Sequence, residues 1–210
     1  KIGYVGAYTY AEVISGYTSF YLGAKSVCPT VTMDVQFTGS WFSVSDEKSA
    51  AQNLIAKGSK LISQHADSMG APSACEEAGV PNVSYNGSTL EACPDTFIVS
   101  SRIDWVPYFK YIIGQAMEEK KIDTDWTGTL ATNSVVLTEL GEKAPAEGTA
   151  AAITAAKEKL MNGTLHVFDT ANFTVTVTEN KNKNATVDEN GKLTGYMADV
   201  NPDTQAVENG

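Results

Sequence analysis

Short apolar runs alternate with helical patterns over the first hundred residues. Residues 2–7 (IGYVGA) are rich in β-branched and small residues without a helical period, which is typical of a strand covered on both faces. From Val13 onward, apolar residues recur at helical spacing up to Val27, and Pro29 follows. The same alternation then continues along the chain. It predicts strands at 31–37, 60–64, 81–85 and 97–100. It also predicts a helix with Asp46 in its first turn and Gly58 just past its end, and a helix at 70–78.

This alternation predicts an α/β fold. Parallel strands need long, right-handed crossovers, and a crossover helix must lie on a face of the sheet. We therefore expect a doubly wound parallel sheet with helices on both faces and the flavodoxin-like strand order 2-1-3-4-5.

The second half of the chain is less regular. We expect a helix over 105–120, with Asp104 as its N-cap, then one strand and a turn within 126–140. A further helix is predicted over 145–161. Strands are expected at 164–168 and 173–178, a hairpin at Asn190-Gly191, and a frayed tail over the last fifteen residues.

Charge and composition exclude several classes of function. The net charge of −10 argues against a nucleic-acid partner, since phosphate binding needs a basic surface. No apolar run approaches the roughly 18–20 residues that cross a bilayer. Because residue 1 already begins a strand pattern, we expect the sequence to be cut from a longer chain.

Ligands of a doubly wound sheet lie beyond the carboxyl ends of its strands. The loops expected at that edge carry aromatic rings, amides and a few charges. Tyr8 and Tyr10 follow the first predicted strand. The candidate ligand-binding residues follow the next four: Trp41, Phe42, His65, Asp67, Asn86, Ser88, Arg102 and Trp105.

The stretch 61–72 (LISQHADSMGAP) brings His65, Asp67 and Ser68 close together in the sequence. A small hydrolase using His65 as base and Ser68 as nucleophile is one interpretation, although no G-x-S-x-G elbow is present. In the alternative, Ser68 caps the following helix and Asp67 binds backbone amides. His65 either donates a hydrogen bond to a ligand or packs within its loop.

Metal and nucleotide-phosphate sites lack their signatures. There are two histidines, three separated cysteines, no Walker-A run and no G-x-G-x-x-G, so we expect neither a metal nor a cofactor. The aromatic and amide walls instead suit a flat, neutral ligand, with Trp41 and Trp105 as stacking candidates unless they cover helix edges.

Four segments carry a resemblance to a known family. They are "KIGYVGAYTYAEVISGYTSFYLGAKSVCP", "GSWFS…EKSAAQNLIAKG", "LISQHADSMGAPSACEEAGVPNVSYN" and "NGTLHVFDT". Together they resemble the basic membrane protein family of ABC-importer substrate-binding lipoproteins, which includes purine-nucleoside receptors.

The resemblance implies a type I periplasmic-binding-protein fold, in which two lobes close on a ligand. It implies that this chain is mainly the second lobe, with the first lobe missing. Residues 1–104 would form the lobe core, 105–140 a helix and strand that cross the hinge, 141–180 the return, and 181–210 the hairpin and tail.

The resemblance also implies a function. This is extracytoplasmic solute binding for an ABC permease, with a lipid anchor upstream of Lys1 and a purine nucleoside or nucleobase as ligand. Nucleoside-binding members carry an acid where Ser88 stands and a lysine near Ser101, so a ribose contact is in doubt. An extracytoplasmic sensor domain is the alternative with the same fold.

The cysteines and the oligomeric state leave alternatives open. Cys28, Cys75 and Cys93 are either three separate buried thiols or one disulfide and a free thiol. If a bridge exists, we expect Cys75–Cys93, because the crossovers that carry them share one face of the sheet. A lobe separated from its partner exposes apolar surface, so we also expect dimerisation.

Overall fold

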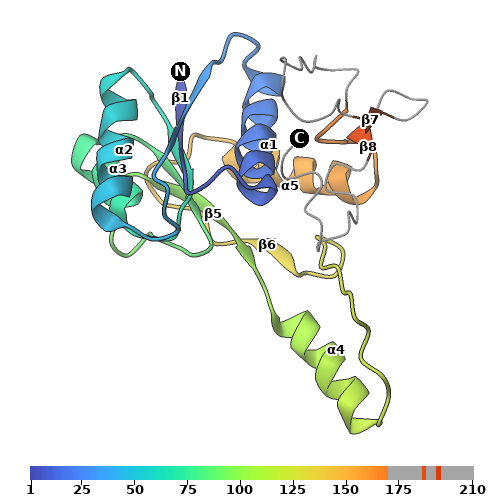
Figure 1. Ribbon diagram of the computed structural model, residues 1–210. Coiled ribbons are helices and arrows are strands. Elements are labelled where there is room, and N and C mark those ends of the chain that lie inside the picture. The colour runs from blue at the N-terminus through green and yellow to red at the C-terminus, as the bar shows by residue number, and fades with distance from the viewer. Residues whose placement is uncertain (170–185, 188–192, 195–210) are drawn as a thin grey trace.

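The computed structural model describes residues 1–169, 186–187 and 193–194. Within them, six strands form one sheet (Figure 1) in the order β2-β1-β3-β4-β5-β6. The first five are parallel, and β6 pairs antiparallel with β5. The predicted order 2-1-3-4-5 is therefore confirmed. The strands are β1 (Ile2–Gly6), β2 (Met33–Phe37), β3 (Ile62–His65), β4 (Asn82–Tyr85), β5 (Phe97–Ile103) and β6 (Val135–Leu137).

Helices cover both faces of this sheet, as a doubly wound fold requires. α1 (Ala11–Val27) lies on one face, whereas α2 (Val44–Ala56) and α3 (Gly70–Ala78) pack side by side on the other. The main core lies beneath α2 and α3, where the buried residues Val5, Leu54 and Ile62 meet several alanines. α2 approaches the sheet so closely that a Cβ on Gly3 would lie 3.1 Å from the Leu54 Cβ.

The opposite face is packed with aromatic rings. The Tyr4 ring contacts Tyr17 and Phe20 of α1, with ring centroids 5.9 and 6.0 Å apart. Tyr17 also meets Phe37 at the end of β2. The helical spacing of apolar residues after Val13 therefore corresponds to a sheet-facing stripe of rings on α1.

A projecting arm follows the sheet (Figure 1). β5 extends three residues beyond its predicted end, and its last residues are exposed and pair with β6. α4 (Val106–Met117) then projects away from the body, and none of its residues is buried. Trp105, rather than Asp104, is the N-cap residue, but the Asp104 carboxylate accepts a hydrogen bond from the Val106 amide at 3.0 Å.

Two predictions near α5 (Thr149–Met161) need correction. The helix begins at Thr149 rather than at 145, because Gly148 before it has a φ of 86° that no helix continues through. The strand expected at 164–168 is absent. The Thr164 and Leu165 amides instead donate to the Lys159 carbonyl, which turns the chain back over the last turn of α5.

The predicted strand at 173–178, the Asn190-Gly191 turn and the last fifteen residues lie outside the described residues. On either side of that turn, β7 (Thr186–Val187) and β8 (Leu193–Thr194) pair antiparallel, as a hairpin requires. None of the described helices combines the length and the apolar character that a membrane span needs.

The cysteines differ from one another in exposure. Cys75 and Cys93 are buried, but Cys28 is exposed after the last turn of α1, so the interpretation as three buried thiols is wrong. All three thiols are free in this structure.

Candidate functional site

Backbone hydrogen bonds join the loops at the carboxyl edge of the sheet. The Thr38 amide donates to the Gly6 carbonyl, and the Gly39 amide donates to the Ala7 carbonyl, each at 2.9 Å. The Asp67 amide donates to the Trp41 carbonyl, also at 2.9 Å. The loops after β1, β2 and β3 therefore form one continuous rim.

Three aromatic rings from two of these loops form a cluster on the rim. Tyr10 stacks against Trp41 at an interplanar angle of 24°, with centroids 5.9 Å apart, and Tyr8 meets both rings. Tyr8 and Trp41 also pack on the core, whereas Tyr10 is about half exposed. The core therefore supports the inner side of the cluster, and the outer side, formed by Tyr10, is exposed to solvent. Phe42 lies beside it, 65% exposed and without a ring contact among those found in the described residues.

Glu47 anchors the rim from inside. Its side chain is wholly buried in the first turn of α2, and its carboxylate accepts hydrogen bonds from the amides of Ser43 at 3.0 Å and Ser68 at 3.2 Å. The Glu47 carboxylate thus links the N-terminus of α2 to the loop before α3. The N-terminal ends of both helices favour a negative charge at this point. A Cβ on Gly70 would lie 2.3 Å from the Val44 carbonyl oxygen, so the loop follows α2 closely.

His65 ends β3 instead of lying in the following loop. The pleat places its side chain on the α1 face, where a Cβ on Gly16 would lie 2.6 Å from its Nδ1. The His65 ring packs on Tyr85 with centroids 4.1 Å apart. Neither ring nitrogen has a hydrogen-bond partner within the part of the chain that the structure describes, and burial lowers the His65 pKa to about 4. The imidazole is therefore neutral at physiological pH.

Acidic groups surround Tyr85. Burial raises the pKa of its phenol, and the nearby carboxylates of Glu12 and Asp67 raise it further. Burial also raises the pKa of Asp67 itself. A hydrogen-bond donor or a cation would be favoured at this part of the rim, and an anion would be repelled.

The loop after β4 continues the rim toward β5. Asn86 adopts a left-handed conformation with a φ of 65°, and its amide donates to the Ser101 carbonyl at 2.8 Å. Ser88 turns away from this point. Its hydroxyl donates to the Glu139 carboxylate at 2.5 Å, and that bond lowers the Glu139 pKa. Glu139, which follows β6, thus brings an acid to the position where Ser88 stands.

The last two candidates lie toward the α4 arm. Arg102 forms an ion pair with Asp104 at 3.7 Å on the exposed end of β5. Trp105 is 56% exposed and contacts Tyr108 and Phe109 of α4. Trp105 therefore belongs to the aromatic surface of the arm rather than to the Tyr8–Tyr10–Trp41 cluster.

The structure places Trp41, His65, Asp67 and Asn86 at or after the carboxyl ends of β2, β3 and β4, on one edge of the sheet. Phe42, Ser88, Arg102 and Trp105 lie at the ends of this edge or point outward. Glu47, Tyr85, Glu12 and Glu139 are contributors that the sequence reasoning did not identify. Of these, Tyr85 had a sequence signal as the last residue of a predicted strand, and Glu47 had one as an acid near the start of a predicted helix.

The structure does not pair His65 with Ser68, as a hydrolase would need. The Ser68 hydroxyl is buried and accepts a hydrogen bond from the Gly70 amide at 3.1 Å, in the helix-start role expected of it. The Asp67 amide donates to the Trp41 carbonyl, but the expected contact of the Asp67 carboxylate with backbone amides is not observed among the described residues. Across the described ranges, no group of three or more His, Cys, Asp or Glu side chains could hold a metal.

Comparison with known proteins identifies relatives of the chain. The family described as "ABC transporter substrate-binding protein PnrA-like" matches residues 1–169. A purine-binding protein of Brucella abortus is 35% identical over 107 residues, which are 51% of this chain and 31% of that protein. A putative ABC transporter glucose-binding protein of Haloferax volcanii is 30% identical over 168 residues, 80% of this chain and 42% of that protein.

A solved structure supports the same fold. The solute-binding protein of an ABC transporter system from Conexibacter woesei superimposes with a TM-score of 0.63 at 22% identity. The match covers 79% of this chain and 56% of that one. The chain therefore spans between about a third and just over half of the length of these proteins, and it has the fold of one lobe of a type I periplasmic-binding protein with segments that extend from it.

Proposed function

Because this chain belongs to the family of PnrA-like ABC transporter substrate-binding proteins, we propose that it is part of the extracytoplasmic solute receptor of an ABC importer. Such a receptor captures a small molecule between two lobes and presents it to a permease. Ligand binding would shift an open–closed equilibrium by the difference in affinity between the two states. In the full-length protein, residues 105–140 would cross the hinge, 141–180 would return to this lobe, and a lipid anchor would lie upstream.

The Tyr8–Tyr10–Trp41 cluster is the observation that carries the choice of ligand. Its rings are fixed by the core and by each other, and Tyr10 leaves an open ring surface at the rim. A planar heterocycle can stack on such a surface, and each stacked base contributes about 1–3 kcal/mol. The Brucella relative is named as purine-binding, which supports a purine nucleoside or nucleobase.

Electrostatics favour an uncharged or donor-rich ligand over an anion. Glu12 and Asp67 both act on Tyr85, and Arg102 is held by Asp104. A phosphorylated nucleotide would meet carboxylates at this edge. A nucleobase or nucleoside can donate N–H and O–H groups to the same carboxylates.

Calorimetry on the full-length protein tests this proposal. We expect heat with adenosine, guanosine or the free purine bases, and weaker or no heat with their 5′-phosphates. Trp41→Ala should weaken binding by about 5–150-fold, the equivalent of one stacked base. Tyr21→Ala is the matched control, because it removes an aromatic ring that packs beside Lys25 in the second half of α1.

Two results would decide against the purine assignment. One is the absence of heat with every purine compound while glucose binds, since the Haloferax relative is named as a putative glucose-binding protein. The other is equal affinity for wild type and Trp41→Ala, which would place the ligand away from the ring cluster.

A further inference from the structure

Two buried cysteines lie on neighbouring segments of the α2–α3 side of the molecule. Cys75 is in the second half of α3, and Cys93 is in the connection between β4 and β5. Both are at most 1% exposed, and both thiols are free. Neither has a role in the rim described above.

The two cysteines lie beside one strand pair. The Cys75 thiol interacts electrostatically with Cys93 and with the Asn82 side chain. Asn82 begins β4 and pairs with Phe97 of β5, whose amide donates to the Cys93 carbonyl at 3.0 Å. Both cysteines therefore converge on the Asn82–Phe97 pair.

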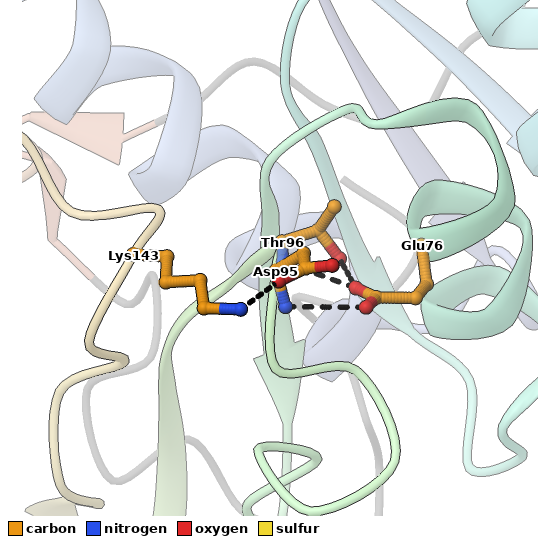
Figure 2. Close-up of polar contacts among 4 residues, drawn as sticks. All are labelled: Glu76, Asp95, Thr96 and Lys143. Carbon is orange, nitrogen blue, oxygen red and sulfur yellow. Dashed lines mark hydrogen bonds and ion pairs between the residues drawn. The ribbon is translucent and has the colours of Figure 1, made fainter.

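A separate set of contacts holds the same two segments together (Figure 2). The Glu76 carboxylate accepts hydrogen bonds from the Asp95 amide at 3.1 Å, the Thr96 amide at 3.0 Å and the Thr96 hydroxyl at 2.6 Å. Lys143 forms an ion pair with Asp95 on the outer side. The segments are thus aligned without help from the thiols.

The protonation of the thiols determines when they can react. Burial, with a smaller contribution from the neighbouring Cys93, raises the Cys75 pKa to about 12. Burial and then Glu76 raise the Cys93 pKa to about 11. The thiolate is the reactive form, so both groups are nearly inert once the fold is complete. They can react while the chain is still folding, when their pKa values are ordinary.

We propose that Cys75 and Cys93 become joined by a disulfide during folding outside the cytoplasm. This rests on the extracytoplasmic location under the proposed function, because oxidising compartments are where disulfides form and persist. One cysteine thiolate attacks a disulfide-carrying oxidant and releases a thiolate from it. The second cysteine thiolate then attacks the cysteine sulfur of the mixed disulfide, which forms the Cys75–Cys93 bond and releases the second thiolate of the oxidant. The cysteines lose two electrons, the oxidant becomes two thiols, and the two cysteine protons pass to them.

Refolding of the 210-residue chain tests the proposal without any ligand, so its failure is distinct from failure of the solute-receptor assignment. The reduced, unfolded chain is refolded with glutathione disulfide, checked for native circular dichroism, denatured and alkylated with N-ethylmaleimide. Intact mass should show a single modification on Cys28, by glutathione or by N-ethylmaleimide, and peptide mapping should show Cys75 linked to Cys93. Cys28→Ser should show no adduct and the same bridge.

A second arm separates folding from later oxidation. The chain folded with reductant and then given the same oxidant should keep Cys75 and Cys93 as thiols while Cys28 reacts. Reduction of the bridged chain should lower its melting temperature by roughly 6–12 °C. Three adducts in natively refolded protein, a bridge that uses Cys28, or failure of the bridged chain to reach the native fold would each overturn the proposal.

Discussion

The buried carboxylate of Glu47 offers a sharp test of how the rim is held. It accepts hydrogen bonds from the Ser43 and Ser68 amides, and no other acceptor is found for either amide in the described residues. Glu47→Ala leaves the buried Ser68 amide without a partner and removes part of the cap of α2. The unpaired amide costs about 1–3 kcal/mol and the cap about 0.5–2 kcal/mol.

We therefore expect Glu47→Ala to lower the free energy of unfolding by about 2–4 kcal/mol. Glu47→Gln keeps one acceptor oxygen but loses the charge, so it should cost about 1–2 kcal/mol. Glu77→Ala is the control, since it breaks only the exposed ion pair with Lys48 at 2.6 Å and should cost less than about 1 kcal/mol.

Urea denaturation followed by circular dichroism measures all three variants. The reasoning also predicts faster hydrogen exchange at residues 66–70 in Glu47→Ala than in Glu77→Ala, because the loop loses its anchor. A cost for Glu47→Ala below about 1 kcal/mol, or one equal to that of Glu77→Ala, would refute the role given to the carboxylate.

Three further predictions follow from the same geometry. Gly70→Ala should destabilise the fold strongly in urea, because its Cβ would meet backbone atoms of α2, whereas Gly87→Ala has open space and should change little. His65 binds a proton more weakly in the folded than in the unfolded chain, so the free energy of unfolding should fall as the pH drops from about 6.5 to about 4 and should not depend on His65 above pH 6.5. His65→Phe should remove this dependence on pH. The exposed apolar face of α4 should make the 210-residue chain self-associate in light scattering, and Ile113→Glu should weaken that association.

Local sequence patterns were sufficient to predict the five parallel strands, but not the antiparallel strand β6 at the edge of the sheet. Alternating strands and helices impose right-handed crossovers, so the order from β2 to β5 follows from the pattern. The antiparallel pairing of β6 depends on a chain that leaves the sheet and returns, and no local periodicity encodes it. At 164–168 a strand-like pattern was overridden because the chain found hydrogen-bond partners at the end of α5.

The sequence was sufficient to predict at which edge of the sheet the candidate site lies, but not which side chains contact one another there. Strand direction alone brings Trp41, His65 and Asn86 to one rim. The face on which His65 lies depends on the register of β3 and on how closely Gly16 lets α1 approach. Glu47 has the sequence signature of an ordinary first-turn acid, and only the tertiary fold shows that it also supports the loop before α3.

The central claim is that the rings and polar groups at the carboxyl ends of β1 to β4 form the ligand-binding face. A crystal structure of the full-length protein with its bound solute tests this most directly. The account predicts the solute in contact with the Tyr10 and Trp41 rings and with at least one of His65, Asp67 and Asn86. A solute bound on the far side, between α2 and α3, or anywhere that leaves these residues untouched, would contradict it.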